Sequence, residues 1–181
     1  MKRNFLFVVS STRRDGNSES LAQHAARFLE PECEQRWLRL IDHPLPAFFD
    51  MRHSSGYPPP EGQAKLLCDA TLAATDLVLV TPVYWYSVSW PAKLYLDHWS
   101  AWMRAPELRF RERMAGRNLW AVTSDSDTAD EGSAKPVVDV LQRTAEYMSM
   151  RWAGALIGHA NRPGEIRGHG GALSAAETFF R

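Results

Sequence analysis

The stretch that decides the fold is Asn4-Phe5-Leu6-Phe7-Val8-Val9-Ser10-Ser11-Thr12-Arg13-Arg14-Asp15-Gly16-Asn17-Ser18. Residues 4–10 carry a continuous apolar run rich in Val and Phe, which is typical of a strand buried on both faces of a parallel sheet. A polar loop follows, and apolar residues at helical spacing then predict a helix over 18–29. A buried strand, a loop and a helix form the repeating unit of an α/β domain.

The rest of the chain repeats this alternation. Further strands are predicted over 34–40, 76–81, 118–124 and 152–158. Further helices are predicted over 61–74, 91–103, 133–148 and 174–180, with loops over 42–60 and 168–171. Five strands alternating with helices predict a three-layer α/β sandwich with a parallel sheet, and right-handed crossovers restrict it to doubly wound strand orders. We expect residues 1–181 to form one domain.

Composition excludes several classes of protein. Hydrophobic residues make up 45% and charged residues 23% of the chain, which is ordinary for an ordered globular protein. Lys+Arg and Asp+Glu are both 21, so the excess of positive charge that a nucleic-acid partner requires is absent. The apolar run that starts at Phe5 stops at Ser10, too early for a signal peptide or a membrane span. We therefore expect a cytoplasmic protein without nucleic-acid or membrane partners.

The metal-binding and thiol residues do not form a recognisable site. The two cysteines, Cys33 and Cys68, are too few for a disulfide scaffold or a four-cysteine metal site, so core packing is their expected role. His159, His169 and Asp130-Glu131 show no metal-ligand spacing. We expect no metal.

The loop after the first strand has the chemistry of a phosphate site. Ligands of such sheets bind beyond the carboxyl ends of the strands. Here that edge would receive hydroxyl and amide side chains, the guanidinium of Arg13, Gly16 for a tight turn, and the positive N-terminal end of a helix. The simpler alternative is that Asn17 or Ser18 only caps the helix. The loop is neither a P-loop nor a dinucleotide fingerprint, because it lacks their glycines and lysine.

Aromatic residues follow the third strand, in Pro82-Val83-Tyr84-Trp85-Tyr86-Ser87. The first and third strands are neighbours in the 2-1-3-4-5 order, and in flavodoxin FMN binds at the point where this order reverses. A phosphate loop beside flat aromatic faces matches a ligand with a phosphate and a ring. Alternatively, Trp85 and Tyr86 pack against a neighbouring subunit, and both can hold at once.

These motifs resemble the NADPH-dependent FMN reductase family, which has a flavodoxin-like fold and is related to NAD(P)H:quinone oxidoreductases. The loop 10–18 is similar to the family's phosphate loop, Gly-Ser-x-Arg-x-x-Gly-Asn-Ser/Thr. Thr81-Pro82-Val83-Tyr84 and the later pair Lys93 and Asp97 are similar to the family's third strand and following helix, and 42–46 to its Pro-rich loop. The resemblance implies a flavodoxin-like three-layer sandwich whose parallel strands have the order 2-1-3-4-5.

The resemblance also implies bound FMN and assigns residues to it. Ser11, Arg13, Asn17 and Ser18 would hold the phosphate, and Gly16 would make the turn. The ribityl chain and ring would lie against Pro82, Val83, Tyr84, Trp85 and Tyr86, and on the other side against Ser124, Asp125, Ser126 and Asp127. Three positions depart from the family pattern: Ser10 replaces a glycine, Asp125 or Ser126 replaces another, and His98 replaces an arginine. Two acids near the ring would disfavour negative charge on the reduced flavin.

The reaction implied is electron transfer from NADH or NADPH, through the flavin, to a quinone or similar small acceptor. The cofactor carries this chemistry, so no catalytic residue is required. His98 is a weak candidate for a proton donor, and its alternative role is that of a hydrogen-bonded helix residue. Two other functions stay open: a flavodoxin-like electron carrier without reductase activity, which the zero net charge disfavours, and a binding module of the same fold without flavin.

The sequence holds seven tryptophans, and three of them fall within 90–103. In the helix predicted there, Tyr95, Trp99 and Trp102 share one face, and Leu94 and Leu96 fill others. A helix that is apolar nearly all round lacks a solvent face, and aromatic-rich surfaces with few charges are common at subunit interfaces. We therefore expect a homodimer or homotetramer through residues 90–103.

Overall fold

The structure, a computed structural model, describes residues 2–126 and 132–181. Its centre is a parallel sheet with the strand order β2-β1-β3-β4-β5. The strands are β1 (Asn4–Val9), β2 (Glu34–Arg39), β3 (Asp76–Pro82), β4 (Asn118–Asp125) and β5 (Arg151–His159). The predicted α/β fold, the five strands and their flavodoxin-like order are confirmed.

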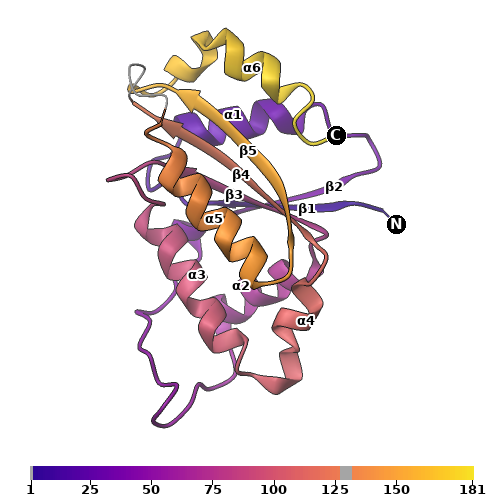
Figure 1. Cartoon of the computed structure of the whole chain (residues 1–181), viewed down its shortest axis with the longest axis vertical. Helices are drawn as coiled ribbons and strands as arrows, with labels where there is room; N and C mark the ends of the chain where they lie inside the picture. The colour runs from indigo at the N-terminus through magenta and orange to yellow at the C-terminus, as the bar shows by residue number, and fades with distance from the viewer. Residues whose placement is uncertain (1, 127–131) are drawn as a thin grey trace.

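Helices cover both faces of the sheet (Figure 1). One face carries α1 (Asn17–Ala26) and α6 (Gly170–Ala176). The other carries α2 (Gly62–Ala73), α3 (Trp90–Trp102), α4 (Phe110–Met114) and α5 (Lys135–Tyr147). Short 3-10 helices span Leu40–Asp42, Pro106–Leu108 and Glu165–Gly168. The sequence pattern did not predict α4 or the 3-10 helices, because each is too short to show a helical period. None of the helices in the described ranges is long and apolar enough to cross a membrane.

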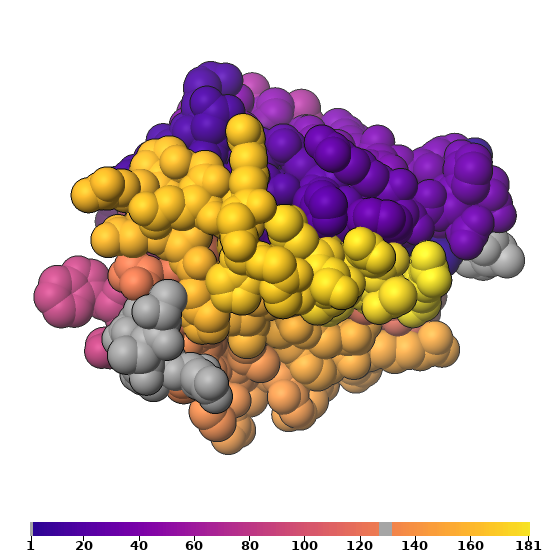
Figure 2. Space-filling model, turned by 90° about the horizontal axis from the view of Figure 1, so that it is seen from above, coloured from indigo at the N-terminus to yellow at the C-terminus, as the bar shows by residue number. Residues whose placement is uncertain are grey.

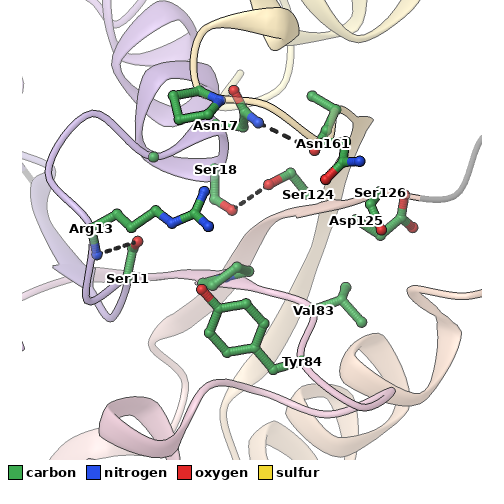
Figure 3. Close-up of a pocket in the computed structure, with 14 residues that line it drawn as sticks. Ser11, Arg13, Asn17, Ser18, Val83, Tyr84, Ser124, Asp125, Ser126 and Asn161 are labelled. Carbon is green, nitrogen blue, oxygen red and sulfur yellow. Dashed lines mark hydrogen bonds between the residues drawn. The ribbon is translucent and has the colours of Figure 1, made fainter.

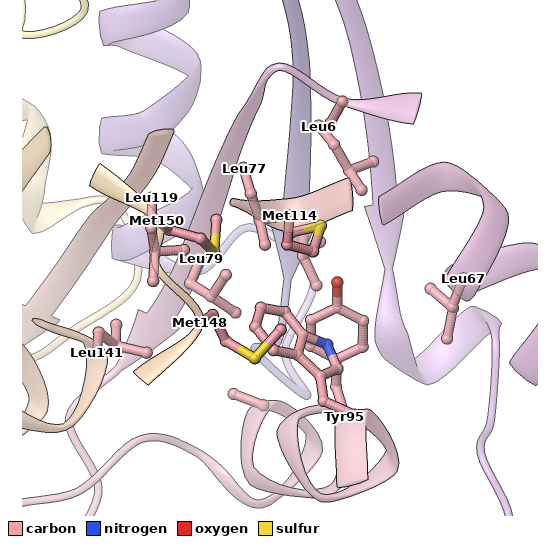
Figure 4. Packing of buried hydrophobic residues seen from close by; sticks show 14 of the residues in the cluster. Leu6, Leu67, Leu77, Leu79, Tyr95, Met114, Leu119, Leu141, Met148 and Met150 are labelled. Atoms are coloured by element: carbon pink, nitrogen blue, oxygen red, sulfur yellow. The ribbon is translucent and has the colours of Figure 1, made fainter. Parts of the chain in front are cut away.

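Each face of the sheet has its own hydrophobic core. In β3, Leu77 and Leu79 pack toward α2–α5 (Figure 4), whereas Val78 and Val80 pack toward α1 and α6. All four side chains are at most 1% exposed. A strand that is buried on both faces needs apolar residues at every position, which explains the uninterrupted run in the sequence.

The aromatic residues of α3 belong to the protein's own core. Tyr95, Trp99 and Trp102 are at most 3% exposed, and the rings of Trp99 and Trp102 meet that of Tyr95 edge to face at 5.7 and 5.8 Å. The expectation that α3 lacks a solvent face is therefore wrong. Its outer side carries Trp90, which is 63% exposed, and an ion pair between Lys93 and Asp97 at 2.5 Å.

The last helix begins four residues earlier than predicted. The His169 ring accepts a hydrogen bond at Nδ1 from the backbone N–H of Ala172, 3.0 Å away, and this contact caps α6. Gly170 and Gly171 therefore belong to α6, and the predicted loop over 168–171 is wrong at these two residues, because a histidine cap is unusual. Past the helix, Phe180 is buried against the rings of Phe5 and Phe7.

The amino-terminal edge of the sheet is closed by a polar network around Asp76, whose side chain is 1% exposed. Its carboxylate accepts hydrogen bonds from the Arg3 guanidinium at 2.6 Å, the Asn118 amide at 2.8 Å and the Trp120 indole at 3.0 Å. Burial acts to raise the pKa of Asp76, but these donors outweigh it and hold the pKa below its usual value. This edge is stabilised by its own side chains, so any ligand site is expected at the opposite edge.

Candidate functional site

A cavity of about 200 Å³ opens at the carboxyl ends of β1, β3, β4 and β5 (Figure 3). It is lined by Ser11, Arg13, Gly16, Asn17, Ser18, Pro82, Val83, Tyr84, Ser124, Asp125, Ser126, Ala160, Asn161 and Pro163. Of the cofactor-binding residues predicted from the sequence, Trp85 and Tyr86 do not line it, Asp127 lies outside the described residues, and all the others line it. We call this cavity the strand-end pocket.

The loop after β1 forms one wall of the strand-end pocket. Ser11 Oγ accepts a hydrogen bond from the backbone N–H of Arg13 at 3.1 Å, and the Arg13 side chain reaches across the mouth of the pocket (Figure 3). The tight turn is made by Asp15, whose φ is 62°, and not by Gly16, whose backbone is extended. Gly16 has a different role, because a Cβ there would lie 3.0 Å from Ser11 Oγ and the Ser11 side chain would have to shift by a few tenths of an ångström.

The α1 helix begins beside this loop, and its N-cap residue, Gly16, provides no side-chain cap for the first backbone N–H groups. Asn17, which was expected to bind phosphate, directs its side chain elsewhere. Its amide donates to the carbonyls of Ala160 and Arg162 at 3.2 and 3.0 Å, and its oxygen accepts from the Gly164 N–H at 3.0 Å. Asn17 therefore anchors the loop after β5, and only its backbone N–H remains for an anion.

Buried hydroxyl groups tie the loops of the site together. Ser18 Oγ and Ser124 Oγ are 2.7 Å apart, which joins α1 to the end of β4. Ser10, the residue that replaces a family glycine, is fully buried and donates to the Val80 carbonyl at 3.0 Å. Its hydroxyl also accepts from Ser89 Oγ at 2.8 Å. The serine thus fastens the loop after β1 to the start of α3.

A strained turn borders the pocket after β3. The backbones of Tyr84 and Ser87 exchange two hydrogen bonds of 3.0 Å, which leaves Trp85 and Tyr86 at the tip with φ of 51° and 58°. Two-residue turns with both φ values positive favour Asn-Gly, so bulky aromatic residues are costly there. Tyr84 lines the pocket, whereas Trp85 is 95% exposed at the tip. The turn stands out from the molecular surface in Figure 2.

Asp125, at the end of β4, is not a free acid. Its Oδ1 lies 2.5 Å from His159 Nδ1, and its Oδ2 accepts a hydrogen bond from the Ser133 hydroxyl. The Asp125 side chain is 4% exposed. The second predicted acid, Asp127, lies outside the described residues. The charge beside the pocket is therefore that of a pair, Asp125 with His159, which the sequence did not predict.

His98 lies outside the strand-end pocket. Its Nε2 is 2.9 Å from the Pro46 carbonyl, and its ring packs edge to face against Phe48 at 5.7 Å. It lines a separate apolar cavity between α3 and the 44–64 segment. Of the two roles considered for His98, the structure favours that of a hydrogen-bonded helix residue, because α3 carries it away from the strand ends.

Sequence reasoning missed the residues that follow β5. Ala160, Asn161 and Pro163 line the strand-end pocket, and Asn17 holds their loop in place. Their position directly after a parallel strand was a usable signal, since the carboxyl ends of all the strands meet at one edge. The residues that the structure describes hold no group of three metal-ligating side chains. Asp130 and Glu131 lie outside that part of the chain, so the absence of a metal stays a prediction.

The strand-end pocket suits a ligand with an anionic end and a ring. The Arg13 guanidinium, the hydroxyls of Ser11 and Ser18, and the start of α1 supply donors and positive charge on one side. Val83 and Tyr84 supply apolar and aromatic surface on the other. FMN has both of these features, so the residues present fit it.

Comparisons with known proteins agree with this fit. A family model described as NADPH-dependent FMN reductase matches residues 3–155. The chain is 27% identical over 176 residues to the Bacillus subtilis (strain 168) protein named "Putative NAD(P)H-dependent FMN-containing oxidoreductase YwqN", and the match covers 96% of this chain and 94% of that protein.

Solved structures share the fold. A Trp repressor binding protein from Bacillus subtilis has a TM-score of 0.77 at 24% identity, with 98% of this chain and 97% of that chain covered. An FMN-dependent NADH-azoreductase from Bacillus anthracis, solved with FMN, has a TM-score of 0.68 at 12% identity, with 98% and 96% covered. Because the family model spans most of the chain, the protein belongs to the NADPH-dependent FMN reductase family, whose members are FMN-dependent NAD(P)H oxidoreductases.

Proposed function

We propose that the strand-end pocket holds FMN and that the protein passes electrons from NADH or NADPH to quinones or similar small, flat acceptors. One observation carries this proposal: the same cavity joins the Arg13 guanidinium and the start of α1 to the aromatic ring of Tyr84. The first two features match a phosphate and the third a flat ring. We also propose that the protein is cytoplasmic, consistent with its family.

The side chains of the site bind and orient. Arg13, Ser11 and Ser18 would hold the phosphate, and the first N–H groups of α1 would add positive potential. Asn17 keeps the loop after β5 closed on the pocket through its three hydrogen bonds. The bound FMN supplies the hydride chemistry, so the protein needs no nucleophile.

The strained turn would form the wall that meets the acceptor. Trp85 and Tyr86 are 95% and 60% exposed, at the rim next to Tyr84. Strained backbone conformations persist where function requires them, and exposed aromatic faces stack on flat rings. We therefore propose that Trp85 and Tyr86 favour aromatic and quinonoid acceptors over small aliphatic ones.

An acceptor panel tests this function. Steady-state rates would be measured for quinones, azo dyes and nitroaromatics with NADH and with NADPH, for the wild type, Trp85→Ala and a control, Phe49→Ala. Phe49 is similarly exposed, at 73%, but lies outside the pocket. We expect turnover of quinones and a KM raised severalfold by Trp85→Ala alone. Failure to reduce any acceptor, or equal KM values for the two variants, would contradict the proposal.

A second copy of the chain is proposed to pack on the outer side of α3. After Tyr95, Trp99 and Trp102 are assigned to the core, the apolar residues left on that side are Trp90 and the partly buried Leu94. Aromatic and aliphatic residues around a single charge pair are common at the centre of subunit interfaces. We propose a homodimer or homotetramer through residues 90–103.

A further inference from the structure

Binding of FMN and of its electron donor does not explain the pair formed by Asp125 and His159. Asp125 lines the strand-end pocket, and Ala160 and Asn161, which directly follow His159, line it too. Asp125 therefore forms part of the wall at the end of β4, and His159, at the end of β5, contacts it without lining the pocket itself.

The hydrogen bonds around the pair fix its protons. His159 Nδ1 is 2.5 Å from Asp125 Oδ1, so Nδ1 donates its hydrogen to the carboxylate. Nε2 is the ring nitrogen that remains to accept a proton. The other carboxylate oxygen is occupied by the Ser133 hydroxyl. With Nε2 unprotonated the pair has a net charge of −1, and with Nε2 protonated it is neutral.

A second histidine stands beside the pair, and its Nδ1 is occupied by the cap of α6. The ring centroids of His159 and His169 are 5.4 Å apart. His169 Nδ1 accepts the Ala172 N–H that caps α6, which requires a lone pair on that nitrogen. Glu165, on the 3-10 helix between them in sequence, accepts the backbone N–H groups of Asn161 and Arg162 at 2.9 and 2.7 Å. Of the titratable groups in contact with His159 in the described residues, Asp125 from β4 is the charged one.

We propose that His159, held by Asp125, takes up one proton when the flavin in the strand-end pocket is reduced, and so raises the flavin's reduction potential as pH falls. This inference rests on the proposed function. NAD(P)H transfers two electrons and one proton as hydride and leaves as NAD(P)⁺, so the flavin gains one negative charge. That charge favours the imidazolium form of His159, and solvent supplies the proton to Nε2. When a two-electron acceptor takes the hydride, the proton returns to solvent.

The proposal predicts a steeper change of the flavin's reduction potential with pH. A proton taken up with two electrons makes reduction tenfold more favourable for each unit of fall in pH, which is about 30 mV per pH unit for a two-electron couple. The extra slope is confined to the pH range over which His159 gains and loses this proton. His159 is a positioning and tuning residue here, because it acts on the flavin through Asp125.

The test measures the midpoint potential of the bound flavin against pH for the wild type, His159→Asn and a control, His169→Asn. Asparagine at 159 keeps an N–H donor for Asp125 but cannot become charged. Asparagine at 169 keeps an acceptor for the α6 cap. We expect His159→Asn to lose up to about 30 mV per pH unit of slope between about pH 5 and 8, with His169→Asn matching the wild type.

Three outcomes separate the possibilities. Coincident lines for the wild type and His159→Asn would overturn this inference alone. A wild-type protein that binds no FMN would overturn the proposed function with it. Histidine NMR of the FMN-loaded wild type gives a readout independent of the variants. We expect the His159 ring to be more protonated at neutral pH in the reduced protein than in the oxidised one, and an unchanged ring would also contradict the proposal.

Discussion

Adjacent residues in the loop after β1 have different surroundings. Arg13 lines the strand-end pocket, whereas Arg14 is 71% exposed and pairs with Asp42 at 3.0 Å. The sequence shows two equivalent arginines, and only the family pattern selects the first. Their separation in the structure provides a matched pair of variants.

Arg13→Ala should weaken FMN binding about 10–100-fold, since a hydrogen bond to a charged group contributes about 1.5–3 kcal/mol. Arg14→Ala should leave the affinity within about twofold, because an exposed ion pair contributes little. Quenching of flavin fluorescence on titration of the apoprotein measures both affinities. Equal losses in the two variants would mean that the phosphate binds elsewhere.

Replacing Asp76 should lower the stability of the fold without changing the affinity for FMN. Asp76→Ala leaves Arg3, Asn118 and Trp120 without their acceptor and should cost on the order of 2–4 kcal/mol in the free energy of unfolding. FMN affinity should not change, because Asp76 lies at the opposite edge of the sheet from the pocket. Urea unfolding measures the cost.

The pH dependence of that cost has a definite sign. The pKa of Asp76 is below its usual value in the folded protein, so its contribution is present above about pH 4 and is lost as pH falls through the folded value. The wild type and Asp76→Ala should therefore converge in stability in acid. A gap that stays constant down to about pH 2 would contradict this role.

Residue chemistry was easier to predict than residue geometry. The types of donor in the loop after β1 indicated an anion site, and those residues do line one pocket. The sequence could not show that Asp15 rather than Gly16 takes the positive φ, nor that the Asn17 amide is occupied by the loop after β5. Both depend on contacts between segments far apart in the chain.

Among the elements, strands were predicted best and the turn after β3 worst. The continuous apolar runs of β1 and β3 follow directly from burial on both faces. The turn at 84–87 has no sequence signal, because Trp85 and Tyr86 are residues that such turns avoid. In this turn the backbone therefore adopts a conformation that its residues disfavour.

Replacing the tip of this turn should stabilise the protein. The double variant Trp85→Asn/Tyr86→Gly supplies the preferred residues for two positive φ values and should raise the free energy of unfolding by about 1–2 kcal/mol. The gain appears as a higher urea midpoint with an unchanged m-value. A lower midpoint would show that the aromatic pair stabilises the fold and that the turn is not strained.

At the scale of the whole molecule, the proposed subunit contact is the outer side of α3, which faces away from the sheet. Trp90→Glu places a charge at the centre of that contact, where desolvating it is costly. Light scattering at micromolar concentration should give at least twice the chain mass of 20.5 kDa for the wild type and the single-chain mass for Trp90→Glu. Phe49→Glu, on an exposed loop, should behave as the wild type. A monomeric wild type would contradict the proposed assembly.

At the scale of the whole molecule, we propose that the strand-end pocket holds an FMN that NAD(P)H reduces. Anaerobic absorbance spectroscopy of the purified protein, loaded with FMN if necessary, tests this most directly. We predict a yellow protein whose flavin band is bleached by NADH or NADPH and returns when a quinone is added. A protein that gains no flavin band after incubation with FMN, or a band that neither nucleotide bleaches, would contradict it.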